Sequence, residues 1–98
     1  MNYKPNPIDT SNIKLSADLE KSTEIISKNI HDVWASNRMS EGWSYGAEHD
    51  AAKKLHPSMV EYEKLSESEK DIDRATVVQT IKMLLWMGYK IEKVEEER

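Results

Sequence analysis

The sequence predicts a mainly α-helical fold with two long packed helices, one short helix, and short extended or β segments at the N- and C-terminal ends. Two stretches of the chain repeat apolar residues at helical spacing. Each stretch follows a serine that can cap a helix and precedes a glycine that can end one. All three prolines lie outside these two stretches, which supports the assignment because proline disrupts helix interiors.

Residues 3–15 are expected to be extended and to pack on the helices. Pro5 and Pro7 bias the preceding residues away from helical conformation, and the polar cluster at residues 9–12 favours a turn. The expected apolar anchors of this arm are Ile8, Ile13 and Leu15.

The first long helix is predicted over residues 17–39. Ser16 is a suitable N-cap, and Gly42 suits the position just past the C-terminal end. Its apolar residues form one stripe at helical period: Leu19, Ile26, Ile30, Val33 and Trp34.

The middle of the chain is predicted as a loop at residues 42–46 followed by a short helix at about 47–55, which Pro57 ends. Residues 58–65 are expected to be irregular. Their inward-facing side chains are expected to be Met59, Val60, Tyr62 and Leu65.

The second long helix is predicted over residues 67–87. Ser66 and Glu69 form the pattern of a capping box, and Gly88 is the expected stop. Its apolar residues at helical spacing are Val77, Val78, Ile81, Leu84 and Leu85. The helices are expected to pack through these two stripes. Residues 89–91 are expected to form a short strand or an extended end, so that one domain covers residues 3–91 and a solvated charged tail covers 92–98.

Composition excludes several classes of protein. A chain of 98 residues makes one domain, and 38% apolar with 33% charged residues is typical of a folded globular domain. The absence of cysteine excludes disulfides and thiolate metal sites. A net charge of −4 without a basic stripe argues against a nucleic-acid partner. No apolar run reaches the roughly 18 residues of a membrane span, and residues 1–5 show no signal region. We therefore expect a cytoplasmic protein with no membrane contact and no cofactor.

The segment from residue 29 to 57 holds all three histidines, two of the three tryptophans and two of the three glycines. Trp34 and Arg38 are four residues apart and share a helix face, and Trp43 follows directly on the loop. Two indoles and a guanidinium could stack on a planar anion such as a nucleotide. Asp50 could accept hydrogen bonds from ribose hydroxyls. The alternative is that Trp34 belongs to the core and Trp43 plugs a loop.

The histidines permit two further interpretations. His49 and His56 are seven residues apart, so a metal site would need more ligands, from Glu48, Asp50 or His31. Acid–base catalysis could use His31 with Asp32 or Asp50. In both cases the alternative is a structural imidazole that bonds to the backbone and packs its ring, and we favour that alternative.

The apolar residues at the C-terminal end of the second predicted helix indicate an interaction surface. Residues 84–87 are consecutive and apolar, and they cannot all face one side of a helix. At least one of them, such as Trp86 or Met87, should therefore point away from the core. The alternative is a helix end that the N-terminal arm and residues 89–91 bury.

The joint pattern of motifs resembles the ryanodine receptor repeat domain, a small module that occurs in pairs in animal calcium-release channels and as single copies in prokaryotes. The resemblance runs from Tyr3 to about Ile91. The motifs that carry it are Pro7-Ile8-Asp9-Thr10-Ser11, Asn29-Ile30-His31-Asp32-Val33-Trp34-Ala35, Gly42-Trp43-Ser44-Tyr45-Gly46, Asp50, His56-Pro57, Tyr62-Glu63-Lys64-Leu65 and Gly88-Tyr89-Lys90-Ile91.

The resemblance implies a mainly helical fold without enzyme activity, and an aromatic pocket with which adenine nucleotides are associated. The positions it implies for such a site are Trp34, Trp43, Tyr45, Asp50 and His56; Arg38 is added from helix geometry. The channel modules are tandem pairs with a long linker, whereas this chain holds one copy. A site shared between copies would therefore need a homodimer or a partner protein, and channel activity is not expected.

Taken together, these observations predict a non-enzymatic ligand-sensing or interaction module that binds an adenine-nucleotide-like molecule. The second interpretation is a structural protein–protein adaptor whose aromatic cluster is core. A third is a nucleotide-processing activity through His31 or His56.

Overall fold

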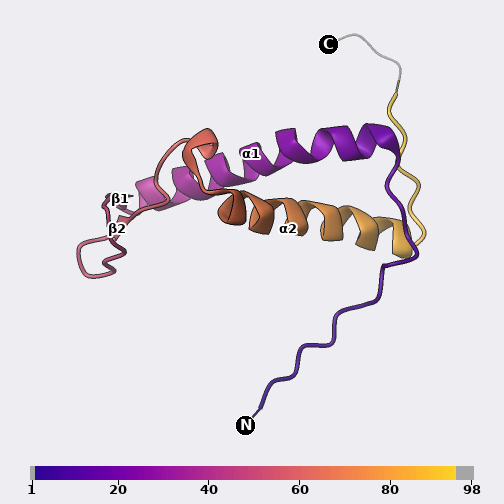
Figure 1. The fold of residues 1–98 in the computed structure, drawn as a ribbon, viewed down its shortest axis with the longest axis horizontal. Coiled ribbons are helices and arrows are strands. Elements are labelled where there is room, and N and C mark those ends of the chain that lie inside the picture. Colours follow the sequence, from indigo (N-terminus) through magenta and orange to yellow (C-terminus); the bar gives the residue numbers. More distant parts are fainter. Residues whose placement is uncertain (1, 95–98) are drawn as a thin grey trace.

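The computed structural model describes residues 2–94 and is dominated by two helices, α1 (Ala17–Ser40) and α2 (Glu67–Trp86). They lie side by side and run in opposite directions, and the C-terminal end of α1 extends past the beginning of α2 (Figure 1). Both predicted long helices are confirmed, as is the mainly α-helical class.

The helix ends form where the sequence places them. The Ser16 hydroxyl accepts a hydrogen bond from the amide three residues on, at 3.2 Å. Ser66 does the same for Glu69, whose carboxylate accepts from the Ser66 amide at 3.3 Å, which completes the capping box. Gly42 and Gly88 follow the two helices with φ of 95° and 99°, a conformation that glycine adopts without steric cost.

The connection between the helices contains the strands. β1 (Ser44–Tyr45) and β2 (Leu55–His56) form a short parallel pair, and a 3-10 turn covers Tyr62–Lys64. A Cβ atom on Gly46 would lie 2.6 Å from the Leu55 Cβ atom, so only glycine lets the two segments approach this closely. Both strands lie in the middle of the chain, whereas the sequence predicts short β segments at its N- and C-terminal ends.

The predicted short helix at residues 47–55 is wrong. Asp50 and Leu55 instead exchange two backbone hydrogen bonds of 2.9 Å and close a tight loop. The Asp50 carboxylate accepts from the Lys53 amide at 3.1 Å, and Lys54 adopts a left-handed φ of 57°. Aspartate favours this local bonding over helix, and the left-handed residue ends any helical run.

The core lies where residues 58–65 pack against the two helices. Its buried apolar side chains are Met59, Tyr62, Leu65, Val77 and Ile81. The inward-facing residues expected in segment 58–65 are confirmed, with Val60 half-buried.

The predicted apolar stripe of α1 is only partly correct. Ile30 is half-buried, but Ile26 is 36% exposed and Val33 is 51% exposed. Two polar residues take the buried positions instead. Ser27 donates to the Thr23 carbonyl at 2.8 Å, and His31 Nε2 bonds to the Val60 carbonyl at 2.7 Å. These bonds remove the penalty of burying polar groups.

The N-terminal arm begins away from the helices and approaches them as it runs toward α1 (Figure 1). Thr10 is buried and donates to the Gln79 side chain at 3.1 Å. Ile13 and Leu15 are half-buried as expected, whereas Ile8 is 43% exposed, so anchoring begins at Thr10. The radius of gyration of 16.8 Å exceeds the ~13 Å of a compact chain of this length.

Within the described residues, the C-terminal segment after Gly88 has neither helix nor strand, so the predicted alternative of a short strand at residues 89–91 is wrong. In the predicted charged tail, residues 92–94 are exposed, and 95–98 lie outside the described residues. Among the helices described, none has the length and apolar character required to cross a membrane.

Candidate functional site

Five side chains from α1, the turn after it, the loop between the strands and β2 meet near the C-terminal end of α1. We call Trp34, Arg38, Trp43, His49 and His56 the aromatic–histidine cluster. Its ring centroids lie 5.1 Å apart for Trp34 and His56, and 5.2 Å apart for the two histidines, both edge-on. Trp43 lies 5.7 Å from His49 and 6.3 Å from His56. Because the rings contact one another, the cluster is a packed aromatic surface rather than an enclosed pocket.

Local structure explains how these residues come together. Trp34 and Arg38 are one helical turn apart on α1. Gly42 turns the chain back, so that the Trp43 amide donates to the Arg38 carbonyl at 3.0 Å. The parallel pairing of β1 with β2 then places His56 beside this turn.

The Arg38 guanidinium lies over the Trp43 ring, with its central carbon 5.4 Å from the ring centroid. This distance is within the range of a cation–π interaction. The same guanidinium approaches the Glu41 carboxylate at 3.4 Å, and its side chain is 43% exposed. The cation is therefore held at the cluster and still reaches solvent.

The His56 imidazole is fixed by the backbone. Its Nδ1 atom accepts from the Ser58 amide at 3.0 Å, so the neutral ring carries its proton on Nε2. Burial lowers the pKa of His56, and the charges of His49 and Arg38 lower it further, against an opposing effect of Glu69. The ring is therefore neutral at pH 7.

This lowered pKa predicts a pH dependence of stability. In the unfolded chain His56 titrates near pH 6.5, whereas the folded protein takes up that proton only at lower pH. The unfolded state therefore binds more protons, and the free energy of unfolding should fall as the pH drops from about 6.5 toward the folded pKa. Urea denaturation at pH 7.5, 6.5 and 5.5 measures this effect. His56→Gln should flatten the profile, and an equally steep profile in that variant would contradict the assignment.

The structure brings four of the six predicted site residues into direct contact: Trp34, Arg38, Trp43 and His56. The other two are adjacent through the backbone. Tyr45 pairs with His56 in the strand register and is 57% exposed. Asp50 uses its carboxylate to bond the Lys53 amide.

Sequence reasoning missed His49 as a member of the cluster. The sequence pattern suggests His49 only as a metal ligand on a helix, but it lies on the loop between the strands, where it contacts both Trp43 and His56. Among residues 2–94, no group of three or more histidine, aspartate or glutamate side chains is arranged to hold a metal ion.

His31 fits the structural alternative rather than the catalytic one. It is 5% exposed, bonds the Val60 carbonyl and stacks on Trp34 with ring centroids 5.7 Å apart. It also lies 6.2 Å from the Tyr62 ring. His31 therefore connects the cluster to the core.

A comparison with protein families identifies the family of the chain. The family model described as the RyR domain matches residues 3–93, which is nearly the whole chain. The predicted resemblance to the ryanodine receptor repeat is thereby confirmed. This chain belongs to the RyR domain family.

Proposed function

We propose that this chain is a non-enzymatic module that binds a planar anionic ligand of the adenine-nucleotide type at the aromatic–histidine cluster. The observation that carries the proposal is the partly exposed Arg38 guanidinium held over the half-buried Trp43 ring. This pair offers an aromatic surface for a base and a cation for a phosphate at one place.

The expected strength follows from these contacts. Stacking of a base on an aromatic side chain contributes about 1–3 kcal/mol, and arginine pairs with phosphate through two parallel hydrogen bonds. One or two such contacts, after the cost of association, correspond to millimolar to high-micromolar affinity. Tyr45 would border the ligand on the exposed side of β1, and Asp50 would accept from a ribose hydroxyl.

A melting experiment tests this proposal. A ligand that binds only the folded state stabilises it by RT ln(1 + [L]/Kd), about 1.4 kcal/mol at ten times Kd. For a domain of this size that corresponds to a rise of roughly 5–10 °C in Tm. We expect ATP, AMP or a cyclic or dinucleotide form to produce such a rise. Ribose 5-phosphate, which lacks the base, is the matched control. If no nucleotide raises Tm at about ten millimolar, the proposal is wrong.

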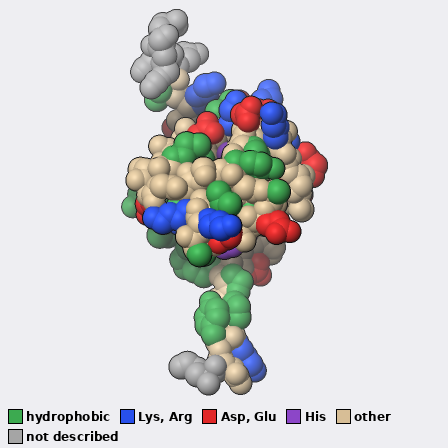
Figure 2. Space-filling view, turned by 90° about the vertical axis from the view of Figure 1, so that its left-hand side faces the viewer, with side chains coloured by type: hydrophobic (Ala, Val, Ile, Leu, Met, Phe, Trp, Pro, Cys, Tyr) green, Lys and Arg blue, Asp and Glu red, His purple; other side chains and the backbone are tan. Residues whose placement is uncertain are grey.

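A second function is favoured by the apolar surface at the end of α2. Trp86 is 52% exposed, Met87 54% and Tyr89 62%. This surface lies at the end of the molecule opposite to β1 and β2 (Figure 1); at the β1 and β2 end, which faces the viewer in Figure 2, basic, acidic and apolar side chains are interspersed. Exposed aromatic residues next to so small a core are typical of a surface that binds protein. The adaptor function would use this surface, in a homodimer or with another protein.

Association in solution checks the adaptor function. We expect the chain to form a dimer with a Kd of about 50 µM, which corresponds to about 6 kcal/mol of association free energy. Trp86→Glu should return the protein to a monomer in static light scattering. Ile25→Glu, at a 74% exposed position of α1, is the control and should leave the dimer intact. A parent protein that stays monomeric would argue against a homodimer through Trp86.

A further inference from the structure

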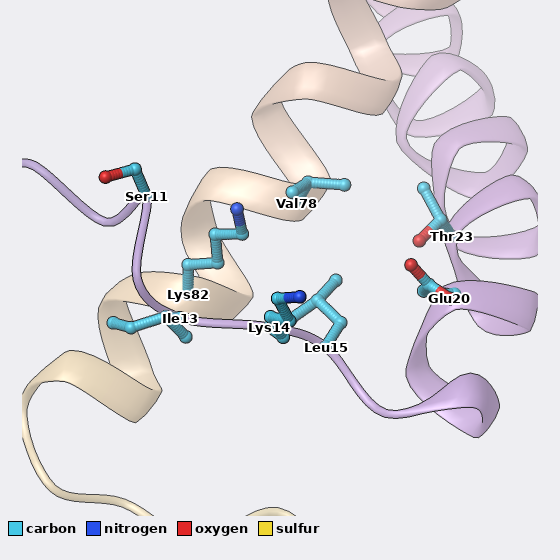
Figure 3. Close-up of a pocket in the computed structure, with 8 residues that line it drawn as sticks. All are labelled: Ser11, Ile13, Lys14, Leu15, Glu20, Thr23, Val78 and Lys82. Carbon is cyan, nitrogen blue, oxygen red and sulfur yellow. The ribbon is translucent and has the colours of Figure 1, made fainter.

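A cavity of about 790 Å³ lies away from the aromatic–histidine cluster, between the end of the N-terminal arm and the two helices. Figure 3 shows side chains from all three elements around it. The volume is within the range of small-molecule sites. Charged side chains line one side of this cavity and aliphatic side chains line the other, and this arrangement favours a ligand with both a charged and an apolar part.

The charged side of the cavity is mainly basic. Lys14 comes from the arm and Lys82 from α2, and Glu20 faces them from α1 (Figure 3). Within residues 2–94, neither lysine forms an ion pair. Lys82 is also half-buried, so part of its side chain packs into the wall of the cavity. Two ammonium groups against one carboxylate favour an anion in this cavity.

The aliphatic side lies next to these cations. Leu15 and Val78 are half-buried and line the same cavity, and Figure 3 places them between Lys82 and α1. An ion without an apolar part would leave the Leu15 and Val78 side chains exposed to water. A ligand with both a charged head and an apolar body would cover it and gain about 25 cal/mol for each Å² of apolar area removed from water.

The backbone around the cavity is fixed rather than loose. Thr10 is buried and bonded to Gln79 on α2, and the Ile13 amide donates to the Thr10 carbonyl at 3.0 Å. A second hollow of about 670 Å³ also borders Lys82 and Ser11. Lys82 therefore borders both hollows, and the hydrogen bond from Thr10 to Gln79 holds the arm beside them.

We propose that this cavity binds a small amphipathic anion, with a carboxylate or phosphate head at Lys14 and Lys82 and a short apolar body along Leu15 and Val78. The site is separate from the aromatic–histidine cluster, so it stands or falls independently of the nucleotide proposal. Glu20 would disfavour heads with several negative charges and thus limit the ligand to a single or double charge.

The test is an NMR titration of the full chain at pH 7 with four probes. Octanoate and octyl phosphate have both parts, octanol has only the apolar body, and inorganic phosphate has only the head. Octanoate or octyl phosphate should shift the amide signals of Ser11, Leu15 and Val78 and bind at least about fivefold more tightly than either partial probe. Equal binding of octanol, or shifts confined to Trp43 and its neighbours, would overturn the proposal.

Charge variants make the test specific. Lys14→Gln and Lys82→Gln should each weaken the binding of the better probe at least about fivefold, the loss of one charge-assisted contact. Lys21→Gln is the matched control, because Lys21 is an exposed lysine of α1 that does not line the cavity. Melting curves of all three variants should match the parent. If the control weakens binding as much as the other two, the lysines act only through net charge and the site is refuted.

Discussion

Replacing Ile81 with alanine should lower the free energy of unfolding by about 2–5 kcal/mol. Ile81 is 9% exposed and lies one turn from Val77, which is 3% exposed, on the face of α2 that enters the core. Truncation removes apolar surface that is buried from water and leaves a cavity that the small core cannot easily refill. Because native stability is only of the order of 5–15 kcal/mol, this one change should bring the protein close to unfolding at 37 °C.

The matched control is Ile72→Ala on the same helix. Ile72 is 68% exposed, so its truncation should change stability by less than about 0.5 kcal/mol. Urea denaturation of both variants measures the contrast. If Ile81→Ala costs no more than Ile72→Ala, the register of α2 against the core is wrong.

Tyr62→Ala should be at least as damaging, at about 3–5 kcal/mol. Tyr62 is 3% exposed and its ring contacts His31, while the Lys70 ammonium lies 5.5 Å from the ring centroid. Its hydroxyl donates to the Glu24 carboxylate at 3.2 Å. The residue thus joins the segment between the helices to both α1 and α2.

Tyr62→Phe separates the ring from the hydroxyl. This variant keeps the packing and removes one hydrogen bond, so it should cost only about 0.5–1.5 kcal/mol. Arg74 still holds Glu24 through contacts of 2.7 and 2.8 Å, which leaves the carboxylate partnered. Equal losses in the two variants by urea denaturation would mean that the hydroxyl, rather than ring burial, makes the contribution.

The helix boundaries could be predicted because their causes are local. Ser66 and Glu69 satisfy each other's backbone amides within four residues, and Gly42 needs only its own φ to end α1. Each of these interactions involves only residues that are close together in the sequence. They do not depend on where the rest of the chain lies.

The loop between the strands could not be predicted because its cause is not local. Residues 47–55 are rich in helix-forming alanine and lysine. The pairing of Ser44 with Leu55 and the close approach at Gly46 override that preference. As a result, His49 lies on the loop between the strands rather than on the predicted helix, and it contacts Trp43. A spacing rule along a helix could not predict this contact.

The buried face of α1 could not be predicted for a related reason. An apolar stripe assumes that buried positions are apolar, and so favours Ile26 and Val33. Segment 58–65 offers a carbonyl acceptor to His31, and the helix itself offers one to Ser27. Polar residues with satisfied hydrogen bonds can then take the buried positions.

The central claim is that the aromatic–histidine cluster is a binding surface and not only part of the core. Trp43→Ala tests it most directly, because Trp43 is half-buried, carries the Arg38 contact and lies outside the helix packing. Calorimetric titration with the nucleotide that raises Tm most should be run on this variant, the parent and Tyr3→Ala. Tyr3 is an 84% exposed aromatic residue on the projecting arm and serves as the control.

We predict that Trp43→Ala weakens nucleotide binding at least about fivefold, the loss of one stacking contact, while its melting temperature stays within a few degrees of the parent. Tyr3→Ala should bind as the parent does. If Trp43→Ala instead unfolds the domain, and no nucleotide binds the parent, then the cluster is core and the ligand-binding function is contradicted.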